Sequence, residues 1–180
     1  MKQVIATSLL LTIFLVGSIF AQNKFVGIKA CAPCHKGEKK GSMAEIWEKS
    51  KHAQAYKSLE SDEAKKIAKE KGLKKAANES PECLECHVTA AKADAKLLDK
   101  GYNKADGVTC EACHGAGSAY KSMTIMKDNK KAVEAGLTVY KDEKAIEAYC
   151  VTCHNEKSPT YKEFKFKEMW AQIAHPLPKK

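Results

Sequence analysis

Every cysteine of the chain lies in a Cys-x-x-Cys-His motif, and the motif occurs four times. Positions i, i+3 and i+4 of a helical turn share one face, so the two thiols and the imidazole of each motif point the same way. Such thiols can form thioethers with one porphyrin edge, and the histidine then binds the iron as proximal ligand. The spacing therefore predicts four covalently bound haem c groups. The thioether cysteines are Cys31 and Cys34, Cys83 and Cys86, Cys110 and Cys113, and Cys150 and Cys153; the proximal histidines are His35, His87, His114 and His154.

Two other uses of paired cysteines explain this pattern less well. Disulfide frameworks are common in exported chains, but they give no reason for a histidine after every second cysteine. Structural zinc is bound by pairs of Cys-x-x-Cys, and it also leaves the four adjacent histidines without a role. The histidines therefore favour haem attachment over both alternatives.

Two histidines remain outside the motifs, and each is a candidate distal ligand of a haem iron. His52 precedes Tyr56 and Leu59 at helical spacing, as expected for a helix packed on a porphyrin. His175 follows an apolar stripe that includes Trp170. Four irons with two imidazoles each need eight histidines, whereas the chain has six. At most two haems can therefore be completed by histidines of the chain itself.

The remaining irons need methionine, another donor, a ligand from a different protein, or no second ligand. Met123 and Met126 lie just after the third motif at positions i and i+3, and either could bind an iron. Methionine is also a common packing residue, so both side chains have an alternative role in the core. The sequence leaves these alternatives open.

The N-terminal segment has the pattern of a secretory signal peptide. Lys2 precedes an almost unbroken apolar run from Val4 to Phe20, and the run ends at Ala21. We predict cleavage after residue 21, export to the periplasm or an equivalent compartment, and a tetrahaem cytochrome domain over residues 22–180. Ile19 is bulky for its place before the cleavage site, so an uncleaved anchor is the alternative. No later apolar stretch is long enough to span a bilayer.

The formal net charge of +9 does not indicate a nucleic-acid-binding protein. All the basic side chains are lysines, and the chain has no arginine to make bidentate contacts with phosphate or guanine. Four haems also carry propionates that offset the excess positive charge. We therefore expect no nucleic-acid partner and interpret the lysines as a solvated surface.

The sequence predicts a mostly α-helical fold with abundant coil and little or no sheet. Its apolar residues are few for a conventional core, so we expect a compact protein built around four haems. Ser42 with Glu45 indicates a capped helix start, and Ser61 and Asp142 are further candidate N-caps. The predicted helices cover residues 43–59, 61–72, 128–135, 142–150 and 166–174.

These residues resemble the cytochrome c-554 family of tetrahaem proteins. Besides the four haem motifs, the matching features are Trp47-x-x-Ser50-x-His52, the run Cys113–Ser118, and Trp170 ahead of His175-Pro176. The resemblance implies a helical fold around closely packed haems, with His52 and His175 as distal ligands. In that family three haems are bis-histidyl and one lacks a strong distal ligand. This chain has one histidine too few, because Tyr120 stands where related sequences often place a histidine.

Two functions are consistent with these features. The favoured one is an electron carrier that serves redox partner proteins and has no substrate of its own. The alternative is an oxidoreductase that acts on nitric oxide, nitrite or hydroxylamine at a haem with an open axial position. The shortage of ligands favours the enzyme. The carrier is favoured because only Tyr120 and lysines are available as proton donors, and no acid–base constellation stands out.

Overall fold

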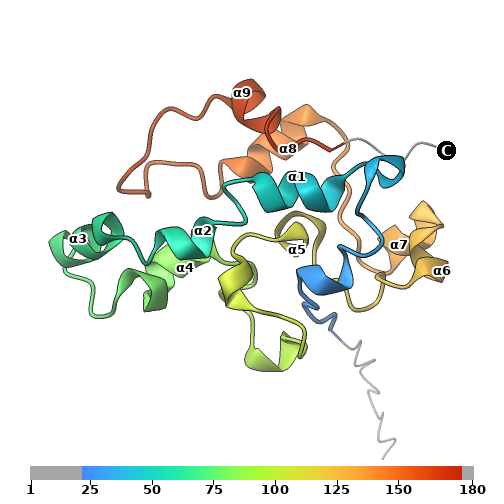
Figure 1. Cartoon of the computed structure of the whole chain (residues 1–180), viewed down its shortest axis with the longest axis horizontal. Coiled ribbons are helices and arrows are strands. Elements are labelled where there is room, and N and C mark those ends of the chain that lie inside the picture. Colours follow the sequence, from blue (N-terminus) through green and yellow to red (C-terminus); the bar gives the residue numbers. More distant parts are fainter. Residues whose placement is uncertain (1–21, 176–180) are drawn as a thin grey trace, which may run out of the picture.

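The computed structural model describes residues 22–175 and shows short helices joined by long irregular segments (Figure 1). The predicted signal peptide, residues 1–21, lies outside the described residues. The α-helices are α1 (Met43–Lys49), α2 (Ala55–Ser58), α3 (Asp62–Glu70), α4 (Pro81–His87), α5 (Cys110–His114), α6 (Met123–Met126), α7 (Asn129–Glu134), α8 (Glu143–Cys150) and α9 (Phe166–Trp170). The 3-10 helices are η1 (Ile28–Ala30), η2 (Glu38–Lys40), η3 (Ala77–Glu79), η4 (Ala95–Leu97) and η5 (Lys104–Asp106).

The fold class predicted from the sequence is confirmed. Across residues 22–175 the only strand-like pairing is an isolated parallel bridge between Phe25 and Leu98, so the described chain contains no sheet. Within the same residues, no helix has both the length and the apolar composition needed to cross a bilayer.

The predicted helix over residues 43–59 is wrong, because the chain breaks between α1 and α2. Ser50 adopts an extended conformation (φ −80°, ψ 160°), and its hydroxyl donates to the carbonyl of Trp47 at 2.7 Å. This side-chain hydrogen bond competes with continuation of the helix. His52 consequently lies in the connecting turn, where its carbonyl accepts the N–H of Val108 at 3.0 Å. The break therefore ties His52 to the segment that leads into the third motif.

The predicted helix caps have mixed outcomes. Ser61 and Asp142 cap α3 and α8 as predicted, accepting the backbone N–H of Ala64 at 3.1 Å and of Ala145 at 2.8 Å. The capping box at Ser42 is wrong. Ser42 has a positive φ of 49° and makes no capping hydrogen bond, and the Glu45 carboxylate instead accepts the N–H of Gly37 at 2.7 Å.

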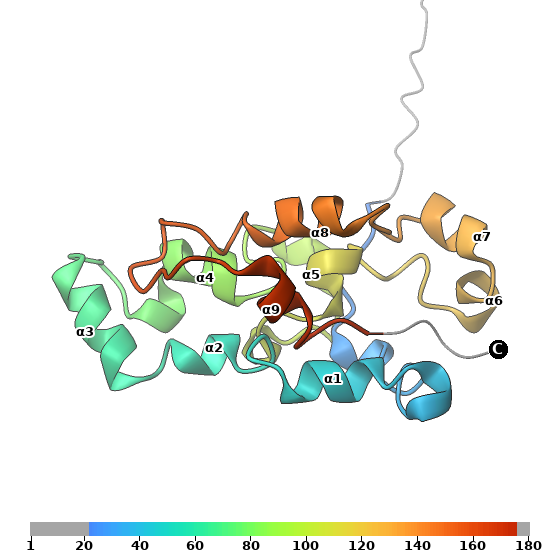
Figure 2. The same cartoon turned by 90° about the horizontal axis from the view of Figure 1, so that it is seen from above.

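The helices are arranged around the middle of an elongated molecule. Figure 2 shows α1 and α2 along one side, α4, α5 and α8 along the other, and α9 between them. Both views place α3 at one end and the α6–α7 pair at the opposite end. Within this frame α2 packs against α4 and η5, and α6 packs against α7.

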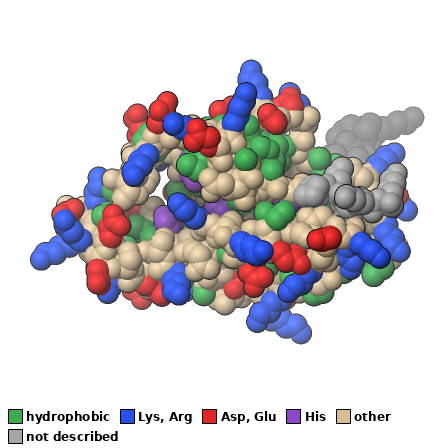
Figure 3. All heavy atoms as spheres, turned by 45° about the horizontal axis from the view of Figure 1, so that its top comes forward, with side chains coloured by type: hydrophobic (Ala, Val, Ile, Leu, Met, Phe, Trp, Pro, Cys, Tyr) green, Lys and Arg blue, Asp and Glu red, His purple; other side chains and the backbone are tan. Residues whose placement is uncertain are grey.

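The conventional hydrophobic core is small. Its one cluster of buried residues consists, among the described residues, of Leu59, Ala68 and Ala77, with Leu73 and Leu84 packed against it. Alanine contributes little apolar area, so burial in this cluster stabilises the fold only modestly. Figure 3 shows lysine and acidic side chains over much of one face, and histidine side chains in a hollow near its middle. The thin core agrees with the expectation that the cofactors supply apolar mass.

One buried carboxylate joins the N-terminal segment to the third motif. Glu111 is 2% exposed, and its oxygens accept the N–H groups of Val26 at 2.9 Å, Gly27 at 2.8 Å and Gly117 at 2.7 Å. Gly27 has a φ of 79°, and a Cβ there would lie 2.3 Å from the carbonyl oxygen of Gly101. The segment that leads into the first motif is thus held close to α5 by contacts that leave no room for another residue at position 27.

Candidate haem-binding sites

The four motifs, numbered in chain order, all adopt the helical turn that the spacing predicted. The second motif lies on α4 and the third on α5, while the fourth begins at the last residue of α8. The first follows η1, and there the N–H of His35 donates to the carbonyl of Cys31 at 3.2 Å. The N–H of His154 donates likewise to Cys150 at 3.0 Å. All eight cysteines are free thiols, so each motif presents both sulfurs for attachment.

Contacts between thiols show which motifs are neighbours. The pKa of Cys31 is raised, first by a hydrogen bond with the Cys110 thiol, which places the first motif beside the third. Burial raises the pKa of Cys86 to about 11, and the nearby Cys153 raises it as well, so the second motif lies beside the fourth. Burial also raises the pKa of Cys113 to about 11, with a further contribution from Cys150. Two hydrogen bonds agree with part of this order: Glu111 of the third motif accepts the N–H of Val26, just before the first motif, and the Tyr149 hydroxyl beside the fourth motif donates to the carbonyl of Ala112 in the third. The motifs are therefore neighbours in the order first, third, fourth, second.

Both histidines outside the motifs face a histidine within one. The ring centres of His52 and His154 are 6.0 Å apart, and those of His175 and His114 are also 6.0 Å apart. A metal–imidazole bond of about 2.0–2.1 Å on each side, plus about 1.2 Å from nitrogen to ring centre, gives a separation of about 6.4 Å. Each pair is therefore spaced to hold one iron. The geometry brings His52 to the fourth motif and His175 to the third.

The electrostatics of these imidazoles also suit metal ligation. Burial lowers the pKa of His52, and the neighbouring His154 lowers it further. Burial likewise lowers the pKa of His154 and of His175. A lowered pKa keeps the ring neutral, which is the form that binds a metal.

Backbone carbonyls orient two of the proximal histidines. The Nδ1 of His87 lies 2.8 Å from the carbonyl oxygen of Ala55, and the Nδ1 of His114 lies 3.0 Å from that of Thr138. With Nδ1–H donating to the carbonyl, Nε2 is the nitrogen left for the iron. These contacts are the usual support of a metal-binding histidine and agree with the predicted proximal role.

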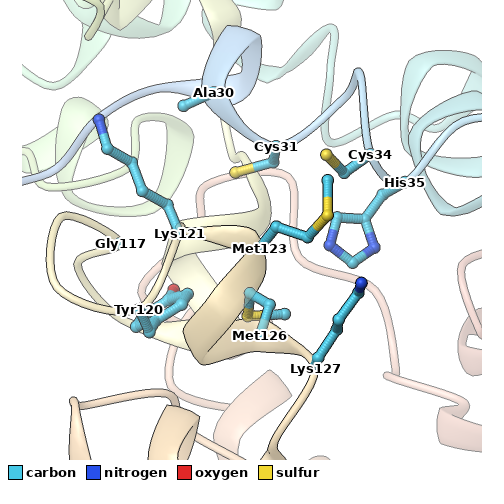
Figure 4. A pocket seen from close by; sticks show the side chains of 10 residues that line it. All are labelled: Ala30, Cys31, Cys34, His35, Gly117, Tyr120, Lys121, Met123, Met126 and Lys127. Carbon is cyan, nitrogen blue, oxygen red and sulfur yellow. The ribbon is translucent and has the colours of Figure 1, made fainter.

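The first motif has different surroundings. Met123, Met126, His35 and both cysteines of the motif line one cavity (Figure 4). The two methionines thus lie with the first motif, although in the sequence they follow the third. The thioether sulfur of a third methionine, Met43, lies 3.2 Å from the Nδ1 of His35, which leaves Nε2 as the nitrogen available to an iron.

Tyr120, which stands where related sequences often have a histidine, is used structurally. Its ring is 6% exposed, and its hydroxyl donates to the carbonyl of Gly115 at 2.6 Å. Burial raises the pKa of this phenol, which keeps the hydroxyl protonated as a donor. His87 takes part in none of the close ring contacts found among residues 22–175, so no imidazole is paired with it there.

Sequence reasoning missed two residues that shape these sites. Glu111 lies between the two cysteines of the third motif, a position that the motif leaves unspecified. Its burial carries no signal in the sequence, because an isolated glutamate is ordinarily a surface residue. Thr138 was missed because its contribution is a backbone carbonyl, which any residue type provides.

The fold and these sites define a c-type cytochrome, a protein that carries covalently attached haem c. Residues 30–115, which include the first three motifs, match the family described as cytochrome c554 and c-prime. Cytochrome c-554 of Nitrosomonas europaea is 29% identical over 147 residues, and the match covers 76% of this chain and 60% of that protein. No solved structure matches the chain. Both comparisons find similarity to the cytochrome c-554 family, in agreement with the resemblance noted from the motifs.

Proposed function

We propose that this chain is an exported tetrahaem cytochrome that passes electrons between redox partner proteins. In this proposal residues 1–21 direct export and are removed, and residues 22–180 form the tetrahaem domain. The observation that carries the proposal is the two histidine pairs, each with ring centres 6.0 Å apart, supported by the neighbouring placement of the four motifs. A row of adjoining redox centres needs no substrate pocket to act as a carrier.

Bound haem supplies one-electron chemistry between ferric and ferrous iron, with each electron taken from one partner and given to another. The chain's own residues do three things for that chemistry. The eight cysteines would hold the four haems covalently, two thiols to each. His52 and His175 would each supply the second axial ligand of one iron. Neutral imidazoles on both sides of an iron keep its ligands unchanged on reduction, which favours transfer without rearrangement.

The oxidoreductase alternative gains no support from the described residues. A catalytic haem site needs a proton donor beside its open position. The Tyr120 hydroxyl, a candidate donor from the sequence, is committed to the carbonyl of Gly115. The lysines Lys121 and Lys127 line the cavity of the first motif, and no aspartate or glutamate is among its lining residues. The carrier is therefore the better supported function.

The test combines intact mass with redox titration of the protein purified from a host that attaches haem c. We expect four haem additions on a chain that begins at residue 22, and reversible uptake of four electrons. A mass with fewer than four additions would contradict the tetrahaem assignment. Retention of residues 1–21 would instead favour the uncleaved anchor.

A further inference from the structure

We propose that a methionine of α6 is the distal ligand of the iron held by the first motif, opposite His35. This inference rests on the proposed haem attachment and deepens it by giving a ligand to a site that histidine cannot complete. It also assigns Met123 and Met126 to a particular motif, which their position in the sequence does not.

Met123 and Met126 lie beside the first motif. α6 is a single helical turn whose first and last residues are Met123 and Met126, so both thioethers lie on one face. Both side chains line the same cavity as His35, Cys31 and Cys34. Figure 4 shows α6 and its methionines on one side of this cavity and His35 on the other, with Met123 extending toward the imidazole. A ligand opposite the proximal histidine must come from this side.

The helix α6 is held firmly in place by its neighbours. Its N-cap, Ser122, accepts the N–H of Ile125 at 3.4 Å. α6 packs against α7, whose Ala132 is fully buried. The end of α7 is in turn held by the side chain of Asn23, which donates to the carbonyl of Ala135 at 2.8 Å. The methionines are thus presented from a defined position.

The other possible donors near this cavity are less suited to bind the iron of the first motif. Met43 contacts Nδ1 of His35, so it lies on the wrong edge of the ring to bind the same iron. The Tyr120 hydroxyl donates to backbone carbonyls instead. Lys121 and Lys127 are exposed, and an amine must lose its proton before it binds iron. A thioether carries no proton and binds haem iron as it stands.

The exposure of Met123 points the same way. Met123 is 62% exposed although it is large and apolar, and it is one of the residues that line this cavity. A flexible thioether in contact with a porphyrin would lose that exposure and gain favourable contacts with the ring. Histidine–methionine ligation also raises the reduction potential relative to two histidines. The first motif, at one end of the order of neighbouring motifs, would then be the site where electrons collect.

The test uses conservative Met→Leu variants of the full-length holoprotein, since leucine keeps volume and hydrophobicity while removing the sulfur. We expect the oxidised parent to show the near-infrared sulfur-to-iron charge-transfer band. Met123→Leu with Met126→Leu should abolish the band, convert one haem to high spin and lower the highest midpoint potential. One single variant should do the same and thereby identify the ligand. If only the double variant does so, the two thioethers are interchangeable and the proposal still holds.

Matched controls separate this outcome from general damage. Met43→Leu removes the thioether on the other edge of His35, and Met169→Leu removes one that is 44% exposed on α9; both should keep the band. Cys31→Ala with Cys34→Ala, which removes the first attachment site, should lose the band but keep the bis-histidyl signals. A parent with four haems but no band, or a double variant that keeps it, overturns the inference. Fewer than four haems would instead count against the proposed function.

Discussion

The third and fourth motifs differ from the first and second in what faces the proximal histidine. The third and fourth each have a neutral imidazole opposite, supplied by His175 and His52. The first faces a methionine-bearing helix, and the second has no imidazole in ring contact with His87 among the described residues. The four motifs present the same chemistry on the attachment side. Their differences therefore arise on the distal side, which distant parts of the chain supply.

This difference has a redox consequence. Two imidazoles stabilise ferric iron more than an imidazole and a thioether do, so the third and fourth sites should have lower potentials than the first. The third and fourth motifs also lie in the middle of the order of neighbouring motifs, between the first motif and the second. The two middle sites would thus have two imidazole ligands each, and the two end sites would differ from them in their distal ligands.

The largest expected effect comes from removing a paired imidazole. His52→Ala and His175→Ala should each convert one haem from low spin to high spin and create one carbon monoxide-binding site, making a paired site resemble the second. EPR and carbon monoxide difference spectra measure both changes. Lys51→Ala, an exposed neighbour of His52, serves as the control and should keep the parent spectrum. The pairing is wrong if both histidine variants retain the parent EPR signals.

A smaller effect is expected from the residue that ties the first site to the third. Glu111→Ala leaves three buried N–H donors without their acceptor, and we expect the free energy of unfolding to fall by about 3–4 kcal/mol. Guanidinium unfolding followed by circular dichroism measures the loss. Glu85→Ala, which alters an exposed spacer glutamate of the second motif, should change stability far less. If Glu111→Ala changed the haem spectrum of only the first or only the third site, the structural link between these two sites would be contradicted.

The smallest effect concerns the hydrophobic cluster beside the second motif. Leu59→Ala should lower the free energy of unfolding by about 2 kcal/mol, at the low end for such a change because partly exposed neighbours can relax into the space. Thermal unfolding measures this loss, with Lys57→Ala on the preceding helix α2 as a surface control. The spin states of the third and fourth sites should stay as they are. A change at those sites would show that the paired and unpaired regions are more tightly coupled than the packing indicates.

The local conformation of the four motifs could be predicted from the sequence because it depends on local spacing. The helical turn at each motif follows from positions i, i+3 and i+4, and His52 and His175 were the only imidazoles left to serve as distal ligands. The helical fold class was predictable for a similar reason. Helix propensity, caps and the lack of alternating apolar runs are all properties of short segments.

What the sequence could not provide is the pairing between distant residues. His52 faces the last motif rather than the nearby first one, and Met126 faces the first motif although it follows the third. The turn at Ser50 that redirects His52 arises from one side-chain hydrogen bond, which helix periodicity does not reveal. The sequence likewise did not indicate that Glu111 is buried and joins two distant segments. These features depend on how the segments pack, and no local pattern encodes that packing.

The buried carboxylate of Glu111 bears on whether haem motifs are interchangeable parts. Its counterpart in the second motif is Leu84, which packs on the hydrophobic cluster, and in the fourth it is Val151, which is 41% exposed. The residues between the cysteines are therefore specific to their location, although the attachment machinery has no need to distinguish them. A chain with these spacers shuffled among its motifs would retain every attachment point and lose the contacts that order them. Transplanting such a motif into a designed protein thus requires its spacer to match the new surroundings.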